Sequence, residues 1–274
     1  MDKNFYVVKV PAINGLGKTD GCEQSGNAIL NSIKEIYSNE QGKAINTNLL
    51  DLEEIHLDNS NLKFTNELIY KNSFKIFEIK PKTIFLGGDH SISYPITRAF
   101  LNHCQNSGKE PCLIVFDAHP DCMEPIDKKF PTHEEWLRGL INDGFPAENI
   151  LLVGVRNSDI KEIKFLREKN IKIISMNQLL EDLQEMCDVI MEFSNNKELY
   201  ISIDIDVIDP AFAPSTGYQE PGGLTSRQFL YLIQRMNKIK TLRAVDIVEI
   251  NENKDRKNNG LTVKLGAKIL AELI

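Results

Sequence analysis

The sequence of 274 residues has few cysteines. There are five, and no two of them are in CxxC spacing. They are scattered along the chain at Cys22, Cys104, Cys112, Cys122 and Cys187. An odd and dispersed set argues against a disulfide framework or a zinc ribbon and favours reduced thiols. We therefore expect a cytoplasmic protein.

Long apolar runs and an excess of positive charge are also missing. No segment approaches the ~18 consecutive apolar residues that a membrane span requires. Residues 1–5 have neither the basic region nor the apolar core of a signal peptide. The formal net charge of −7 is unsuited to a phosphate backbone. We expect no membrane and no nucleic-acid partner, whereas a small cationic substrate is compatible with this charge.

The chain has no repeat, low-complexity tract or linker, so we expect residues 1–274 to form a single domain. Short apolar runs alternate with amphipathic stretches roughly eight times. This alternation predicts a three-layer α/β/α domain with a mostly parallel, roughly eight-stranded sheet. Strands are expected at 5–10, 46–52, 83–86, 112–117, 150–155, 171–174, 199–204 and 242–248. Helices are expected at 26–37, 62–79, 94–106, 133–143, 158–169, 176–193, 226–236 and 261–273. In such sheets the ligand crevice lies where the strands stop.

The segment Gly-Leu-Gly-Lys-Thr at 15–19 ends like a phosphate-binding P-loop. The full pattern requires a glycine five residues before Gly17, and Ala12 stands there. We interpret the segment as a loop over the strand ends.

Acidic residues follow the apolar, β-branched run at 199–203. Side chains two apart on a strand share a face, so Asp204 and Asp206 are predicted to converge. Two carboxylates at one point repel each other unless a cation lies between them. The alternative is an acidic turn ended by Pro210, which also explains Asp209.

A second run, at 113–116, is followed at once by Asp117, His119 and Asp121. The three alternate, and mixed carboxylate and imidazole ligands suit manganese, zinc or iron. A third candidate, His90, follows a strand and a Gly-Gly turn. Four carboxylates would be balanced by two divalent ions, which make a nucleophile from water at neutral pH. The candidate ligands are His90, Asp117, His119, Asp121, Asp204 and Asp206.

Two further segments carry polar residues near expected strand or helix ends. Thr132 is a plausible helix N-cap and Glu135 completes a capping box, which leaves His133 without a structural role. The last expected strand carries Asp246 and Glu249, one of which can project into the crevice.

Three motifs resemble the signatures of the arginase/agmatinase (ureohydrolase) family. They are Gly-Gly-Asp-His-Ser at 87–91, Asp-Ala-His-Pro-Asp at 117–121 and Ser-Ile-Asp-Ile-Asp-Val-Ile-Asp-Pro at 202–210, and the segments at 211–217 and 222–225 continue the likeness. The resemblance implies an arginase-like fold, two Mn²⁺ per chain and hydrolysis of a guanidino group to urea and an amine. It also implies a homo-oligomer, a trimer or a hexamer.

The resemblance also implies roles for the candidate ligands. His90 and Asp121 would bind one manganese, His119 and Asp206 the other, and Asp117 and Asp204 would bridge them. A metal-bridging hydroxide would attack the guanidinium carbon, and Asp121 would orient it.

Outside the ligand set, the resemblance makes His133 the proton shuttle for the leaving amine. It assigns Glu249 to the guanidinium nitrogens, which a carboxylate can hold through two hydrogen bonds. Asp209 becomes a turn residue.

Substrate identity is the point at which the resemblance weakens. Met123, Lys129 and Pro131 stand where arginases hold the α-carboxylate with Asn, Ser and Asn, although Lys129 can pair with a carboxylate. Asp159 stands where arginases contact the amino group, and Tyr218 departs from the family pattern in a way that can reshape the pocket. This combination favours agmatine or another guanidino-amine. A formimino or amidino compound, a one-zinc amidohydrolase and a catalytically silent member are the alternatives.

Overall fold

The computed structural model describes residues 5–15, 17–127 and 129–274. The residues 1–4 considered for a signal peptide, and Leu16 in the segment 15–19, lie outside the described residues.

One sheet of eight strands forms the middle layer, in the order β2-β1-β3-β8-β7-β4-β5-β6. Every neighbouring pair is parallel, so the predicted α/β/α class is confirmed. The strands are β1 (Phe5–Val10), β2 (Leu50–Glu54), β3 (Thr83–Gly87), β4 (Pro111–Phe116), β5 (Ile150–Val153), β6 (Lys172–Ile174), β7 (Glu198–Asp204) and β8 (Leu242–Val248).

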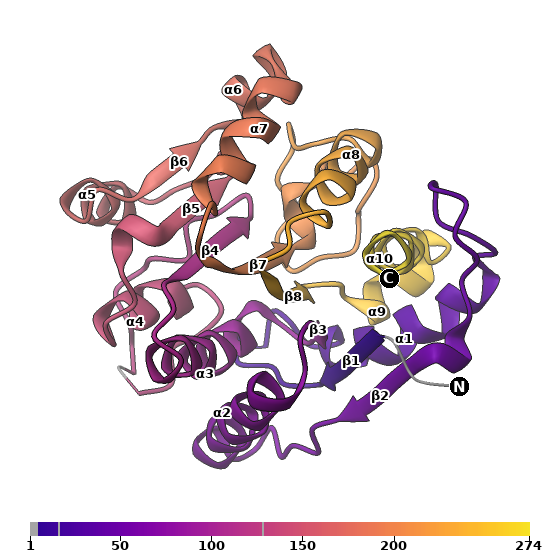
Figure 1. The fold of residues 1–274 in the computed structure, drawn as a ribbon, viewed down its shortest axis with the longest axis horizontal. Helices are drawn as coiled ribbons and strands as arrows, with labels where there is room; N and C mark the ends of the chain where they lie inside the picture. The colour runs from indigo at the N-terminus through magenta and orange to yellow at the C-terminus, as the bar shows by residue number, and fades with distance from the viewer. Residues whose placement is uncertain (1–4, 16, 128) are drawn as a thin grey trace.

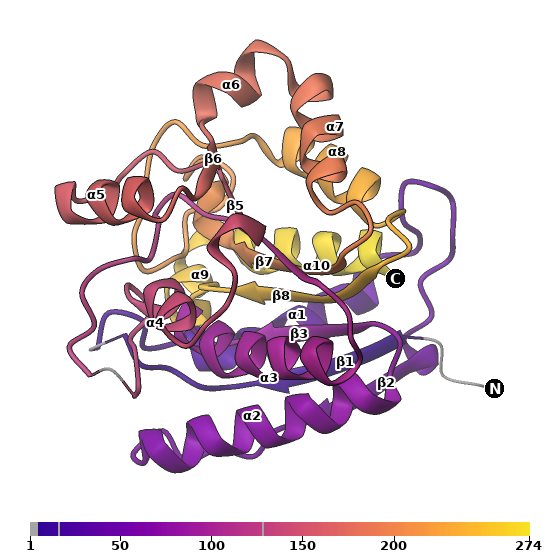
Figure 2. The ribbon, with the colours of Figure 1, turned by 60° about the vertical axis from the view of Figure 1, so that its left-hand side comes forward.

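Helices cover both faces of this sheet, as Figures 1 and 2 show. Helices α2 to α5 contribute to the hydrophobic cluster on one face, and α1, α6, α7, α8 and α10 to the cluster on the other. The helices are α1 (Ser25–Ser32), α2 (Leu62–Ile79), α3 (Ser93–Asn106), α4 (Trp136–Asn142), α5 (Ile160–Glu168), α6 (Met176–Glu181), α7 (Leu183–Phe193), α8 (Ser226–Met236), α9 (Glu252–Asp255) and α10 (Leu261–Leu273). None of the helices in the described ranges is long and apolar enough to cross a membrane.

Among the expected elements whose bounds differ, two differ because a polar side chain caps a turn. The helix expected at 176–193 is two helices, since Asp182 accepts the N–H groups of Gln184 and Glu185 and starts α7. The strand expected at 46–52 begins only at Leu50, because Asn46 caps a 3₁₀ turn. The helix expected at 133–143 begins at Trp136.

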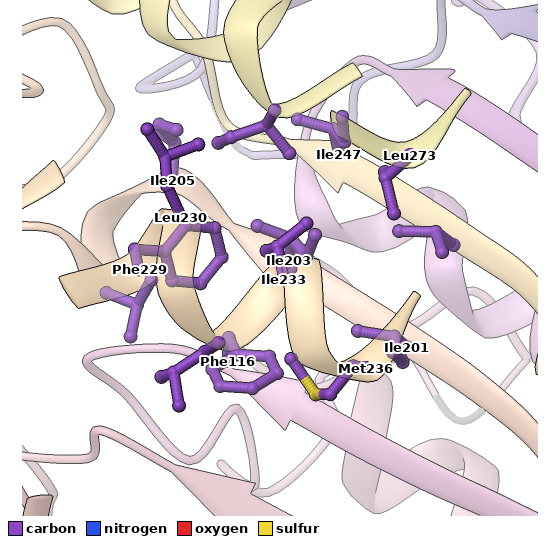
Figure 3. Packing of buried hydrophobic residues seen from close by; sticks show 14 of the residues in the cluster. Phe116, Ile201, Ile203, Ile205, Phe229, Leu230, Ile233, Met236, Ile247 and Leu273 are labelled. Atoms are coloured by element: carbon purple, nitrogen blue, oxygen red, sulfur yellow. The ribbon is translucent and has the colours of Figure 1, made fainter. Parts of the chain in front are cut away.

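The central strand β7 is buried along its whole length. Its alternate residues Ile201 and Ile203 belong to the same cluster as Phe229 and Ile233 of α8, and Figure 3 shows these side chains packed together. Phe229 also meets Phe116 of β4 edge to face, with ring centroids 5.4 Å apart. Apolar residues on both faces of a strand are expected when helices cover both sides of a parallel sheet.

The register of the four central strands aligns their carboxyl ends. Leu86 pairs with Ile247, Ile247 with Ile203, and Ile203 with Phe116. The residues that follow these pairs therefore leave the sheet at one level of its edge, although they come from distant parts of the sequence. This edge is where a parallel sheet of this kind binds ligands.

The packing of α8 on β7 can be tested by truncating Phe229, which is completely buried. Phe229→Ala should lower the free energy of unfolding by about 3–5 kcal/mol, because it leaves a cavity in addition to losing apolar contacts. Urea denaturation followed by circular dichroism measures the change. Phe64→Ala is the matched control, since Phe64 is 49% exposed and should cost less than about 1 kcal/mol. Equal losses in both variants would contradict the packing described.

Candidate metal centre

Side chains from three strand ends meet in two groups that share one carboxylate. The ligand atoms of His90, Asp117 and Asp204 lie within 4.8 Å of one another, and so do those of Asp117, His119 and Asp206. These residues lie at or just after the ends of β3, β4 and β7. The structure therefore brings together the predicted ligands on both sides of Asp117.

Asp121 belongs with the first group. The Nδ1 atom of His90 lies 2.9 Å from Asp121 Oδ2, 3.1 Å from Asp117 Oδ2 and 3.3 Å from Asp204 Oδ2. In the second group, His119 Nδ1 lies 3.0 Å from Asp206 Oδ2 and 3.5 Å from Asp117 Oδ1. All six predicted ligands are thus in one cluster.

Turns, rather than continued strand alternation, produce this convergence. Strand β4 ends at Phe116 and β7 at Asp204, so the expected alternation does not persist through the motifs. Asp204 accepts the N–H of Asp206 at 2.8 Å and caps a 3₁₀ turn. Asp121 has φ +50°, in the left-handed region. Each carboxylate is therefore aimed by its own turn.

A buried network holds His90 from behind. The Nε2 atom of His90 lies 2.9 Å from Ser202 Oγ, which donates to Asp246 Oδ1 at 2.7 Å. Asp246 also accepts hydrogen bonds from Ser93 and Tyr200, each at 2.7 Å. Asp246 therefore lies beneath the crevice. Of the two acidic residues near the end of β8, Glu249 is the one that reaches the crevice. Since the other ring nitrogen is engaged, Nδ1 is the atom that His90 turns toward the carboxylates.

His119 is held in the same manner by a loop residue. Its Nε2 lies 3.3 Å from Glu220 Oε1, which also accepts a hydrogen bond from Asn157 at 2.7 Å. Carboxylates that bond the second nitrogen of a histidine fix its orientation at metal sites. Sequence reasoning did not assign roles to Ser202 or Glu220. Ser202 lies inside a motif that carries the family likeness, whereas Glu220 lies between the two segments that continue it, and no local signal marks either residue.

Asp89 is a further buried carboxylate that the sequence analysis left unassigned. It accepts hydrogen bonds from Asn14 N at 2.6 Å, Thr19 Oγ1 at 2.8 Å and Ser91 N at 3.1 Å. The loop after β1 is thereby fastened beside His90, as expected for a loop over the strand ends. Asp89 caps the turn that carries His90 by accepting the N–H of Ser91. Its short side chain before the turn was an available N-cap signal.

The donor set fits divalent cations on geometric grounds. His90 Nδ1 and Asp117 Oδ2 are buried and have no hydrogen-bond partner, although they lie 3.1 Å apart. Buried polar atoms without partners are costly. Two such atoms that face the same point are suited to share an ion.

Electrostatics supports the same fit. Burial and the carboxylates of Asp206 and Asp117 raise the pKa of Asp204 well above its usual range. Burial and Asp117 raise the pKa of Asp121 to about 7. Although burial alone would lower the pKa of His90, the facing carboxylates raise it. Crowded anions in a buried site therefore require protons or metal cations to balance them.

Glu249 and His133 form a pair on the wall beside the ligands. Glu249 Oε1 accepts the backbone N–H of His90 at 2.9 Å and lies 3.2 Å from His133 Nδ1. Although burial alone would lower the pKa of His133, Glu249 raises it to about 9. His133 lies in the turn before α4, where Glu135 accepts the N–H of Thr132 at 3.1 Å. This is the hydrogen bond that the predicted capping box requires, but it stabilises a turn that precedes the helix.

A cavity of about 210 Å³ opens above the cluster. The residues that line it are His119, Asp121, Met123, His133, Glu134, Asn157, Ser158, Asp159, Glu162, Asp204, Asp206, Thr216, Tyr218 and Glu249. Asp159, Tyr218 and Glu249 are thus placed at the cavity, as predicted for substrate contacts. Lys129 is not brought to it, because this residue lines a separate surface hollow with Tyr70 and Arg98.

Tyr218 forms one side of the cavity mouth. Its ring stacks on that of His133, with centroids 5.8 Å apart, and its hydroxyl donates to Glu134 at 2.7 Å. Lys18 lies over the same ring, with Nζ 4.7 Å from the centroid. Asp159 is exposed at the rim and caps α5 by accepting the N–H of Lys161 at 2.8 Å.

Fold and site together define an α/β/α protein with two candidate metal-ligating groups that share an aspartate. The arginase family model matches residues 3–274. The chain belongs to the arginase family, which confirms the resemblance.

Individual relatives agree with the family model. Mitochondrial arginase 1 of Oryza sativa subsp. indica is 31% identical over 192 residues, which cover 70% of this chain and 54% of the rice protein. The chain thus spans about half the length of the plant arginases it matches. The arginase of Staphylococcus aureus strain MRSA252 is 27% identical over 237 residues, covering 78% of this chain and 77% of the bacterial protein.

Solved structures show the same fold. Proclavaminate amidino hydrolase from Streptomyces clavuligerus superposes with a TM-score of 0.86 at 24% identity, covering 99% of this chain and 91% of that one. Formimidoylglutamase from Bacillus subtilis gives a TM-score of 0.85 at 23% identity, covering 100% and 87%.

The His133–Glu249 pair should make the metal-free protein less stable as the pH rises. The pKa of His133 is raised from 6.5 to about 9 in the folded state. The pair therefore adds about 3 kcal/mol to the free energy of unfolding below about pH 6.5. This contribution is lost as the pH rises toward 9. The difference in unfolding free energy between wild type and His133→Gln should therefore shrink between pH 6 and pH 10.

Urea denaturation in the presence of a chelator measures this difference. His56→Gln is the matched control, because the side chain of His56 is 90% exposed, and it should show no such slope. A difference for His133→Gln that grows with pH would contradict the pairing.

Proposed function

We propose that this chain is a binuclear manganese hydrolase that cleaves a guanidino group to urea and an amine. The observation that carries the proposal is the pair of ligand groups sharing Asp117, at the base of a cavity whose wall holds His133 and Glu249. Carboxylates with imidazole nitrogens are a ligand set that suits manganese.

The ligand set divides between two ions. His90, Asp117, Asp121 and Asp204 would hold one, and His119, Asp206 and the bridging Asp117 and Asp204 would hold the other. When bound, the two cations supply Lewis-acid polarisation and ionise water at neutral pH.

Glu249 is suited to orient the guanidinium group. Its Oε1 atom accepts the N–H of His90 and lies beside His133. The residue also lines the cavity. A carboxylate beside planar N–H groups gives directional, charge-assisted hydrogen bonds. Held in this way, the guanidinium carbon would lie above the ligand cluster.

His133 holds the proton that the leaving amine needs. Its pKa of about 9 keeps the imidazole protonated at neutral pH, and it lines the cavity. A positioned acid that donates to the departing nitrogen avoids the expulsion of an amide anion. Proton transfer would pass from His133 to the amine nitrogen as the C–N bond breaks.

The rim favours a substrate with a second positive charge. The described residues that line the cavity include no lysine or arginine, and they include the exposed carboxylates of Glu134 and Asp159 at its mouth. Carboxylates at the mouth attract a cation and repel an acid. Agmatine, or another guanidino-amine, is the substrate class we propose.

A guanidino acid is the second candidate, because Lys18 lies beside Tyr218 at the mouth. Lys18 contacts Tyr218 through Nζ and is a candidate partner for a substrate carboxylate. In this alternative, Lys18 would take the role that the sequence suggested for Lys129.

Removing the shared carboxylate tests the metal centre. Asp117→Ala should abolish manganese retention and urea release together, since both ligand groups lose a member. Atomic absorption after gel filtration and a urea assay measure the two. Asp188→Ala on α7, whose side chain is 60% exposed, should retain both. An Asp117→Ala protein with normal manganese and full turnover would rule out the assignment.

A substrate panel tests specificity. Urea release from arginine, agmatine, guanidinobutyrate, guanidinopropionate and guanidine should be highest with agmatine, with kcat/KM at least about tenfold above guanidinobutyrate, equivalent to about 1.4 kcal/mol. A preference for guanidinobutyrate that Lys18→Ala removes would instead support the guanidino-acid alternative. Activity on none of them, with manganese bound, would overturn the proposed reaction.

A further inference from the structure

Trp136, the sole tryptophan of the sequence, contacts two predicted metal ligands. It is completely buried at the start of α4. Its indole Nε1–H donates to Asp121 Oδ2 at 2.8 Å. Its ring lies over that of His90, with centroids 4.7 Å apart and planes tilted by 39°.

The same end of α4 also holds the backbone of Asp121. The carbonyl of Asp121 accepts the N–H groups of Leu137 at 3.2 Å and Arg138 at 3.4 Å. Asp121 has φ +50°, a left-handed conformation that is unfavourable for a non-glycine residue unless its surroundings hold it. The first turn of α4 therefore fixes both the main chain and the side chain of this ligand.

The indole bond determines which way the Asp121 carboxylate faces. Oδ2 accepts from Trp136 and lies 2.9 Å from His90 Nδ1. Among the described residues, Trp136 makes the one hydrogen bond to this carboxylate that is not with a predicted ligand. Without it, the carboxyl group could rotate and lose its place beside His90.

Simple core packing does not account for this contact. A buried indole N–H needs a partner, and most buried polar groups in proteins find one in a backbone carbonyl or water. Here the N–H instead satisfies a ligand carboxylate, while the ring face contacts a second ligand. Both contacts lie on the same side of the cluster.

We propose that Trp136 is a positioning residue for the ion held by His90 and Asp121, an inference that rests on the proposed metal centre. It orders Asp121 through the N–H and His90 through the ring. It acts on one of the two ions, because the hydrogen bond and ring contacts found for it reach neither His119 nor Asp206.

Trp136→Phe tests the role of the N–H, because phenylalanine keeps an aromatic ring against His90 and removes the donor. Outer-sphere partners of metal ligands typically contribute 10–100-fold to metal affinity. Competition between the metal-free full-length protein and a fluorescent chelator for Mn²⁺ should show one of two affinities weakened by about that factor. The other affinity should stay within about threefold of wild type.

Phe145→Leu is the matched control for lost packing. Phe145 lies in the same hydrophobic cluster as Trp136 and is 2% exposed, and it contacts no predicted ligand in the described network. This variant should keep both manganese affinities within about threefold. If it weakens binding as much as Trp136→Phe, the effect is general destabilisation and the proposal is wrong.

The wild-type protein provides a second measurement, in case Trp136→Phe does not fold. With a single tryptophan, ¹⁵N-TROSY spectra contain one indole N–H signal. A donor bonded to a buried carboxylate should be protected from solvent exchange, and the signal should shift when the diamagnetic ion Zn²⁺ is added.

The outcomes separate this inference from the proposed function. If wild type binds no Mn²⁺, the metal centre itself fails. If wild type binds Mn²⁺ but Trp136→Phe folds and retains both affinities, the positioning role alone fails. An indole N–H that exchanges freely, or that does not respond to Zn²⁺, also overturns it.

Discussion

Repulsion among buried carboxylates is the constraint on which this molecule depends. Asp117, Asp121, Asp204 and Asp206 meet within a few residues of the ends of the neighbouring strands β4 and β7, and all four are buried. Anions at such separations in a low dielectric cannot all remain ionised without compensation. The sheet holds them together because its buried strands stabilise the fold independently of the site. Cations bound in the two groups, which have Asp117 in common, would restore the ionised state that the crowding opposes.

The surrounding network orders the two ligand histidines from the side that faces away from the carboxylate cluster. His90 is backed by the hydroxyl of Ser202 and, through it, by Asp246, whereas His119 is backed directly by Glu220. The first support is completely buried and built from strands. The second is a half-buried loop contact. The two histidines thus have supports of different rigidity, which makes the His90 side the more strictly preorganised of the two.

The fold and the ligand set were predictable from the sequence because both depend on short-range patterns. Apolar runs and their alternation with helices identify all eight strands. The motif residues follow these apolar runs directly in the sequence, so they lie next to strand ends. The supports were not predictable, because they join residues far apart in the chain. Trp136 and Asp121 are close in sequence, but the left-handed backbone at Asp121 that brings them together has no local signature. Loop conformation also decides which hollow a side chain lines, and Lys129 lines one that is separate from the cavity.

The cavity mouth is formed by contacts between loops. Lys18 and Tyr218 are 200 residues apart in sequence and are in contact, and Tyr218 in turn donates a hydrogen bond to Glu134. These residues come from the loops after β1, β4 and β7, and the last two loops also carry predicted metal ligands close to the strand ends. Variation farther along these loops can therefore change the charge that a substrate meets while the carboxylate cluster stays the same. The residues next to the strand ends form the candidate metal centre, and the residues farther along the same loops form the mouth above it.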